Sequence, residues 1–501
     1  MHLPADSAHK GTPSQSTQSN IPSGSSETLV LAEEATGDRM TTAGDRAAVA
    51  GDRVMGEDRA TARVAPTIDE ATDKLPAVSA PSGGKTTVAG DRAMGEDRAI
   101  DEATDSLSPV AASSGKGGRA SWVKWYEALK SILPIYIGIH LAFFVTSFLS
   151  VLFVLSDFSK QSMPIYTLWQ SWHHWDTGNF LVVAVHGYTA PNQTAFFPLY
   201  PIFERGLMFI TNNPFTAGLI ISDVAGLVML VVLYRLVEED FDAERAYRTV
   251  LYLSVFPTAF FLAAAYNESL FICFALFSFY YMRHGNWWLA GLFGFLATLT
   301  RSSGLFLLVP FCYEYLRQQH FNLRTIRFDI ISGLAMPAAI GAFALYCYFQ
   351  FHDALASLHA QAYWHPRMHI PGEGMILSLR LITHSGGLLN FQAIHNLLDL
   401  VPDLLVLGLI ILSFVGPWKL PRNLWAYGLY AAALYLFFQL YPTTGIFPLL
   451  SVARYLLEVF PAFIILASLG KNRTIHMSYL MVSGATLFFL LAQFLIGRWV
   501  L

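Results

Sequence analysis

The chain has 501 residues, of which 54% are hydrophobic, 14% aromatic and only 14% charged, and its formal net charge of -4 indicates no nucleic-acid partner. These averages combine two different segments. Residues 1–120 contain no Trp, Phe, Tyr or Cys, whereas apolar and aromatic residues dominate from 121 onward. Such a distribution is typical of a multi-span membrane protein that carries a polar tail.

The polar tail, residues 1–120, cannot bury enough apolar surface to offset the entropy lost on ordering. It contains a degenerate duplication: GDRVMGEDRA at 51–60 recurs as GDRAMGEDRA at 90–99, and IDEATD at 68–73 recurs at 100–105. The two copies differ in internal length, so they are not solenoid repeats. We expect a disordered, low-complexity cytosolic spacer, with a partner-binding arm as the alternative.

Apolar stretches of about 20 residues, or fewer where helices are short or tilted, predict transmembrane helices over residues 121–501. About eleven such stretches lie near 131–155, 215–237, 249–266, 268–282, 287–300, 304–316, 330–350, 400–416, 424–441, 454–469 and 478–497. A further helix within 196–209 would lie in the membrane interface. The predicted fold class is therefore an all-α, polytopic integral membrane protein. No apolar core precedes the first span, which we expect to act as an uncleaved signal anchor.

The distribution of basic residues predicts the orientation of these spans. Lys and Arg precede the first span and recur in each loop assigned to the cytosol, so the N-terminus is expected in the cytosol. The long loops 156–214 and 351–399 are poor in Lys and Arg for their length and are assigned to the extracytoplasmic side. The membrane would be a bacterial plasma membrane, or that of the endoplasmic reticulum if the chain is eukaryotic.

The first of these long loops contains the highest concentration of residues that could bind or react with a substrate. It reads WHHWDTGNF at 172–180, HGY at 186–188 and AFFPLYP at 195–201. A carboxylate, Asp176, thus lies among imidazoles and aromatic rings beside the first span. Because a carboxylate next to a bilayer is costly unless it has a role, we interpret this loop as a candidate site that a lipid-linked substrate could reach.

Four blocks in chain order resemble the PIG-V family of mannosyltransferases. The loop just described is the first. The others are FPTAFF at 256–261 followed by AYNESLF at 265–271, RSSG at 301–304 where the family tends to show Arg-Ser-Asn-Gly, and RY at 454–455 with FP at 460–461. Each block alone is weak, but four in order are specific. The polar tail has no counterpart in the family.

The resemblance, over about 122–469, implies a membrane glycosyltransferase of the GT-C type, as a prokaryotic relative of the family. Such an enzyme would take mannose from a polyprenyl-phosphate-mannose donor to a lipid-linked or glycan acceptor on the extracytoplasmic face, by inverting displacement. In eukaryotes the family adds the second mannose to glycosylphosphatidylinositol precursors. The expected partners are membrane lipids, the donor and the acceptor, and no cofactor is expected besides the donor.

This transfer needs a general base, negative charge near the developing oxocarbenium ion, and N–H donors for the leaving phosphate. Asp176 is the predicted base, with the alternative that it caps a helix starting at Thr177. Glu268 is the predicted second catalytic carboxylate, with the alternative that it is an acid at a helix start, which the helix dipole favours. Glu204 with Arg205 is interpreted as an interfacial ion pair, and as a further carboxylate only alternatively.

The remaining predicted site residues would bind substrate. Arg301 and Arg454 are preferred for the leaving phosphate because both lie in matching blocks at span ends, although an arginine there can also extend to lipid headgroups. Other arginines on the same side are Arg205, Arg367 and Arg380. The other predicted substrate-binding residues are Trp175, His173, His174, His186, Tyr188 and Asn267.

A metal site is not expected. His173 and His174 lie beside Asp176, but neither has helical i, i+4 spacing to it, and the resemblance calls for no metal. We therefore assign hydrogen bonding to sugar or phosphate to at least one of these histidines, with divalent-metal ligation as the alternative. The three cysteines, in apolar segments without a CxxC motif, are interpreted as small buried hydrophobes: Cys273, Cys312 and Cys347.

Three other functions fit parts of this pattern. A polytopic lipid or solute transporter or flippase would also have many spans, but it would carry charges at mid-membrane, whereas the acids here are predicted at span ends. A membrane scaffold would leave the clustered Trp, His and Asp without a purpose. A GT-C enzyme for another sugar is compatible with every block, because sugar choice depends on one or two hydroxyl contacts.

Overall fold

The computed structural model describes residues 117–155, 164–364, 367–443 and 445–498. Every regular element within these ranges is a helix, which confirms the predicted all-α fold. The predicted tail over 1–120, with its duplication, lies outside the described residues except for its last four positions, where α2 (Gly117–Ser150) begins.

Five helical segments are long and apolar enough to cross a membrane: Trp122–Phe153, Pro214–Asp240, Phe328–Phe351, Phe391–Phe414 and Arg473–Leu495. They belong to α2 with its π-helical extension Val151–Leu155, α6 (Pro214–Asp240), η6 (Phe328–Leu334) continued by α11 (Ala335–Phe351), α14 (Phe391–Phe414) and α18 (Arg473–Leu495). A sixth span results if Val452–Glu458 and Phe460–Leu469, bent by 82°, cross together. The chain is thus an integral membrane protein by helix length and composition.

The eleven predicted spans exceed this number because several apolar stretches are interrupted. They form shorter helices, namely α7 (Ala243–Ser254), α8 (Glu268–Arg283), α9 (Trp287–Thr300), α10 (Leu308–Gln318) and α15 (Trp425–Gln439). Short 3₁₀ turns separate some of them, at η3 (Ala259–Leu262) and η4 (Ser302–Leu307). A hydropathy window counts apolar residues across such breaks, whereas a continuous α-helix requires an unbroken series of backbone hydrogen bonds from each N–H to the carbonyl four residues earlier.

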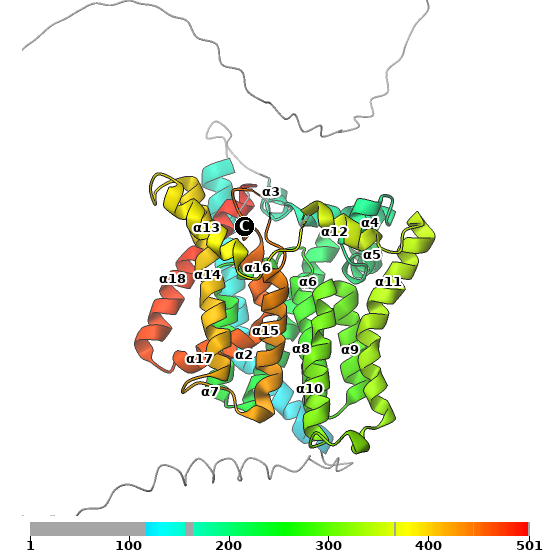
Figure 1. The fold of residues 1–501 in the computed structure, drawn as a ribbon. Coiled ribbons are helices and arrows are strands. Elements are labelled where there is room, and N and C mark those ends of the chain that lie inside the picture. Colours follow the sequence, from blue (N-terminus) through cyan, green and yellow to red (C-terminus); the bar gives the residue numbers. More distant parts are fainter. Residues whose placement is uncertain (1–116, 156–163, 365–366, 444, 499–501) are drawn as a thin grey trace, which may run out of the picture. The chain divides into compact units, whose positions relative to one another are not determined.

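Shorter elements join these helices, and several of them gather at one end (Figure 1). At that end lie α3 (Tyr166–Gln170), α4 (Asp176–His186), α5 (Leu199–Thr211), α12 (Ala356–Trp364) and α13 (Glu373–His384). The helix predicted within 196–209 is α5. The remaining elements are η2 (Pro191–Ala195), η5 (Leu323–Thr325), η7 (Arg422–Leu424), α16 (Val452–Tyr455), η8 (Leu456–Glu458) and α17 (Phe460–Leu469).

Side-chain caps fix where several of the long helices start. Asn213 accepts a hydrogen bond from the backbone N–H of Thr216 at the start of α6, where Pro214 occupies the first turn. Asn472 caps α18 in the same way. These caps satisfy backbone donors that the first helical turn leaves unpaired.

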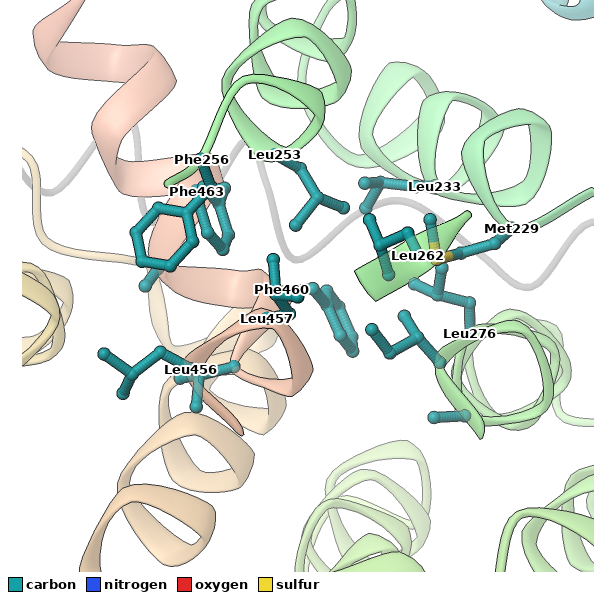
Figure 2. Packing of buried hydrophobic residues seen from close by; sticks show 14 of the residues in the cluster. Met229, Leu233, Leu253, Phe256, Leu262, Leu276, Leu456, Leu457, Phe460 and Phe463 are labelled. Atoms are coloured by element: carbon teal, nitrogen blue, oxygen red, sulfur yellow. The ribbon is translucent and has the colours of Figure 1, made fainter. Parts of the chain in front are cut away.

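The residues that directly follow α16 in the chain belong to the apolar core. Leu456, Leu457 and Phe460 all belong to the buried apolar cluster, and Figure 2 shows Phe460 pointing toward Leu262 and Leu276. Phe460 is fully buried and its ring lies 5.3 Å from that of Phe279 on α8. The close packing of these apolar side chains holds the short α16–η8 segment in place.

The cysteine prediction is correct at two of three positions. Cys273 and Cys347 are buried, but Cys312 is exposed. The buried face of α10 includes Pro310, Phe311 and Glu314, and Cys312 lies off this stripe.

Candidate active site

Asp176 lies at the first position of α4. The preceding residue, Trp175, has φ 53° and ψ -118°, which is uncommon for a residue with a side chain and marks a sharp entry into the helix. No side chain caps this helix start, so the alternative role of Asp176 as the cap of a helix starting at Thr177 is wrong. The Asp176 Oδ2 atom instead accepts a hydrogen bond from Nη1 of Arg454 at 2.8 Å.

Five charged side chains from four segments form a chain of alternating sign, which we call the ion network. Arg454 contacts Asp176, and its Nε lies 3.3 Å from Oε1 of Glu268. Arg301 donates from Nη1 to the same Glu268 oxygen at 2.8 Å, and its Nε lies 2.8 Å from Oε1 of Glu458. The structure therefore brings together four predicted site residues, and the two that are farthest apart in sequence, Asp176 and Arg454, are separated by 278 positions.

Burial differs sharply within the ion network. The side chain of Asp176 is 27% exposed, whereas those of Glu268 and Glu458 are 1% and 0% exposed. The network holds three carboxylates and two guanidiniums, so it carries one net negative charge when all groups are ionised. Asp176 is the carboxylate of this network that a substrate can best reach, while the buried acids are enclosed with their partners.

Aromatic rings surround the guanidinium of Arg454. Its central carbon lies 5.0 Å from the ring centroid of Tyr455, 5.3 Å from that of Phe261 and 5.4 Å from that of Tyr266. Such ring faces attract a cation. The Tyr266 hydroxyl also donates to the carbonyl oxygen of His174 at 3.2 Å, which ties the first loop to the start of α8.

Asn267 joins two helix ends at the ion network. Its Nδ2 donates to the carbonyl oxygen of Thr300 at 2.9 Å, and its Oδ1 accepts from Nη1 of Arg301 at 2.9 Å. Both polar ends of this buried amide are engaged by protein groups. In this structure Asn267 thus orients Arg301.

His173 and His174 diverge from each other. The His173 ring packs edge-on against Phe215 of α6 at 5.1 Å, and the His174 ring packs against Phe494 of α18 at 5.5 Å. Burial lowers the pKa of both imidazoles, so they are neutral at physiological pH. Within the described ranges, no group of three or more His, Cys, Asp or Glu side chains is arranged to hold a metal ion.

The structure does not bring His186 and Tyr188 to the ion network. His186 is the last residue of α4, about 15 Å along the helix from Asp176 at 1.5 Å per residue, and Tyr188 lies two residues beyond that end. Tyr188 is buried, donates to the carbonyl oxygen of Phe196 at 2.6 Å and packs on Phe343 of α11. It joins the first loop to α11. Trp175, by contrast, is 40% exposed directly beside Asp176.

The predicted ion pair of Glu204 with Arg205 is wrong. Glu204 is fully buried against α6, and neither carboxyl oxygen has a hydrogen-bond partner among the described residues. Burial raises the pKa of Glu204 to about 9. Arg205 instead donates to the carbonyl oxygen of Ala184 at 3.4 Å. Adjacent helical residues project in different directions, so sequence neighbours on α5 cannot share a face.

Sequence reasoning missed Glu458 and Ser303. Ser303 donates from Oγ to Oε2 of Glu458 at 2.8 Å, so both oxygens of that buried acid face polar groups. A signal was present, because Glu458 is a lone acid inside the apolar run LLEVFPAFIILA. A buried acid in such a run needs a partner, and the partner, Arg301, lies in another block.

The fold and the ion network define a polytopic, all-helical membrane protein with a carboxylate–arginine centre at helix ends. Comparison with known families relates it to glycosyltransferases. Residues 193–348 match the family described as dolichyl-phosphate-mannose-protein mannosyltransferase. This range contains Asn267, Glu268 and Arg301.

The relatives found among characterised proteins are named GPI mannosyltransferases. The chain is 27% identical over 206 residues to GPI alpha-1,6-mannosyltransferase 2 of Homo sapiens, covering 36% of this chain and 40% of the relative. It is 34% identical over 116 residues to GPI mannosyltransferase 2 of Drosophila pseudoobscura pseudoobscura, covering 21% and 25%. It is 30% identical over 146 residues to GPI mannosyltransferase 2 of Schizosaccharomyces pombe, covering 28% and 31%.

These comparisons confirm the resemblance to the PIG-V mannosyltransferases, although the matched stretches span less than half the length of each relative. Among solved structures, the chain is similar to ArnT from Cupriavidus metallidurans bound to undecaprenyl phosphate. That similarity has a TM-score of 0.42 and 14% identity, and it covers 67% of this chain and 60% of ArnT.

Proposed function

We propose that this chain is a membrane glycosyltransferase that transfers mannose from a polyprenyl-phosphate-mannose donor to a lipid-linked or glycan acceptor. The reaction takes place on the extracytoplasmic face and needs no cofactor beyond the donor. One observation carries the proposal: Asp176, the most exposed acid of the ion network, is held by the buried Arg454 at a helix end. The names of the relatives support the class of reaction.

In the proposed reaction, Asp176 accepts the proton of the acceptor hydroxyl. The hydroxyl oxygen attacks the anomeric carbon from the face opposite the phosphate, the bond from that carbon to the phosphate oxygen breaks, and the phosphate leaves with the electron pair. The net negative charge of the network favours positive charge developing on the sugar ring. Arg454 and Arg301 supply N–H donors on the side of the leaving phosphate.

Glu268 and Glu458 have a different role in this proposal. Both are enclosed and each contacts a guanidinium, so they hold Arg301 and Arg454 in place. Such fixed partners keep the reacting groups within the narrow range of positions that transfer requires.

The test is a transfer assay in purified membranes with labelled polyprenyl-phosphate mannose. Asp176→Asn is expected to lower kcat by about 10²- to 10⁴-fold, the usual contribution of a general base. Asp242→Asn is the matched control, because Asp242 caps α7 through the N–H of Arg245 and Asn caps a helix equally well. Wild-type activity in Asp176→Asn would refute the proposed role of Asp176.

A second candidate function, lipid transport, is supported by a specific observation. The expectation that acids lie only at span ends is wrong, because α14 begins at Phe391 and encloses Asp399 and Asp403 within its length. Both are fully buried: Oδ2 of Asp399 lies 3.5 Å from Nδ1 of His395, and Oδ1 of Asp403 accepts a hydrogen bond from Nε2 of Gln439 at 2.8 Å. Ionisable residues inside a span often mark transport pathways. Labelled lipid that crosses the bilayer without being consumed would favour this second candidate.

A further inference from the structure

Tyr455 of α16 contacts both arginines of the ion network. Its ring centroid lies 5.0 Å from the central guanidinium carbon of Arg301 and 5.0 Å from that of Arg454. Arg454 also donates from Nη2 to the Tyr455 hydroxyl oxygen at 3.3 Å. The rings of Phe261 and Tyr266 contact Arg454 alone. Within the described ranges, Tyr455 is thus the aromatic side chain that the two arginines share.

The surroundings of Tyr455 hold its ring in place. The ring packs on that of Phe438 of α15, with 5.4 Å between the centroids. The next two residues along the chain, Leu456 and Leu457, are buried in the apolar core. Tyr455 itself is only partly exposed. The ring therefore offers the two arginines a fixed surface, because closely packed side chains do not shift freely.

The two guanidiniums need such a surface because they are close to each other. Both approach the same oxygen, Oε1 of Glu268, at 2.8 Å from Arg301 and 3.3 Å from Arg454. Like charges at this separation repel. The negative face of an aromatic ring attracts a cation, so a ring that both guanidiniums contact offsets part of the repulsion.

A ring also leaves the N–H donors of the arginines free. A guanidinium carries its five N–H donors along the edge of its plane, whereas an aromatic ring engages its face. In both arginines, Nη1 and Nε contact carboxylates of the ion network. Among the described residues, Nη2 of Arg301 has no hydrogen-bond or ion-pair partner, and Nη2 of Arg454 has only the long contact to Tyr455. These two Nη2 groups are the donors that remain for an added anion.

We propose that Tyr455 is a positioning residue, whose ring holds the faces of Arg301 and Arg454 so that their Nη2 groups remain available together to the leaving phosphate. This inference rests on the proposed transferase function, because the phosphate is the leaving group of that reaction. The carboxylates of the ion network occupy N–H donors of the arginines, whereas the ring supports the same guanidiniums without occupying those donors.

The first experiment measures binding, which does not depend on transfer. Fluorescent undecaprenyl phosphate and the matching undecaprenol are titrated onto the purified full chain in dodecyl maltoside. Tyr455→Leu is expected to weaken binding of the phosphate about tenfold and to leave undecaprenol binding unchanged, because the arginines lose their shared support. Tyr455→Phe keeps the ring and is expected to bind both probes like wild type. Wild type that does not bind the phosphate more tightly than undecaprenol would overturn the proposal.

Tyr441→Leu is the matched control for the loss of a ring. Tyr441 is also partly buried and packs on Phe437 of α15 at 5.9 Å, but within the described part of the chain no guanidinium lies over its ring. This variant is expected to bind undecaprenyl phosphate like wild type. If it loses as much affinity as Tyr455→Leu, the effect is a general loss of packing and the positioning role is refuted.

The second experiment measures transfer from labelled polyprenyl-phosphate mannose to octyl mannoside. Tyr455→Leu is expected to lower kcat/KM for the donor about tenfold and to leave KM for octyl mannoside unchanged, whereas Tyr455→Phe retains wild-type values. A loss in Tyr455→Phe as large as in Tyr455→Leu, or wild-type behaviour of Tyr455→Leu, overturns the positioning role while the transferase function stands. If wild type transfers no mannose although phosphate binding depends on the ring, the transferase function fails. The role toward a leaving group then falls with it, and ring-dependent phosphate binding stands.

Discussion

The substitution Glu268→Gln tests whether the charges of the ion network, and not only the burial of its side chains, stabilise the folded protein. Glu268 is 1% exposed and its Oε1 lies 2.8 Å from Arg301 and 3.3 Å from Arg454. Glutamine keeps the shape of the side chain but removes its charge. Two buried guanidiniums then share the remaining carboxylates, Asp176 and Glu458.

The expected loss in the free energy of unfolding depends on the contacts that each arginine keeps in the variant. Removing one partner of a buried ion pair costs about 3–5 kcal/mol, because a charge is left without compensation. Here Arg301 keeps Glu458 at 2.8 Å and Asn267 at 2.9 Å, and Arg454 keeps Asp176 at 2.8 Å. The loss in the free energy of unfolding should therefore lie at the low end of that range, about 3 kcal/mol.

The assay is equilibrium unfolding in mixed micelles of dodecyl maltoside and sodium dodecyl sulfate, followed by the circular dichroism of the helices. Glu204→Gln is the matched control, since Glu204 is equally buried but holds its proton at neutral pH and contacts no cation. Its cost should not exceed about 1 kcal/mol. A Glu268→Gln variant as stable as wild type, or a control that loses as much, would refute the view that the network stabilises this end of the protein.

The wild-type free energy of unfolding should fall as pH rises from about 5 to 9. The folded chain keeps the proton of Glu204, whose pKa is about 9, while the unfolded chain releases it near the ordinary value of 4.5. This group alone therefore contributes a slope of about -1.4 kcal/mol per pH unit to the free energy of unfolding. Glu204→Gln should flatten the profile, and an equally steep profile in that variant would contradict the assignment. In a eukaryotic host, the exposed sequon at Asn192 should be glycosylated and that at Asn472 should not, as read from an endoglycosidase-sensitive gel shift, with Asn192→Gln as the control. Modification of Asn472 would contradict the proposed orientation.

The members of the site were predictable from the sequence, but their pairing was not. Asp176, Glu268, Arg301 and Arg454 each lie in a recognisable block. Which acid faces which arginine depends on how α4, α8, α9 and α16 pack, and short motifs carry no information on that packing. The same limit explains why Glu458 was missed, because its role exists only through Arg301.

The assignments of His186 and Tyr188 show a second limit. Both lie in the same block as Asp176, and the sequence suggested a shared site. The regular helix α4 begins at Asp176 and ends at His186, so His186 lies at its far end and Tyr188 beyond it. Closeness in sequence implies closeness in space only where the backbone turns, and here it runs straight.

The span count and the site have a common physical origin. Each member of the ion network lies where a helix starts, ends or bends: Asp176 and Glu268 are the first residues of α4 and α8, and Arg301 directly follows α9. Arg454 lies in the four-residue α16, and Glu458 ends η8 just before the 82° bend. A charge that faces lipid in mid-span costs about 3 kcal/mol or more. The breaks that shorten the apolar helices place these charges at helix ends, where they meet one another.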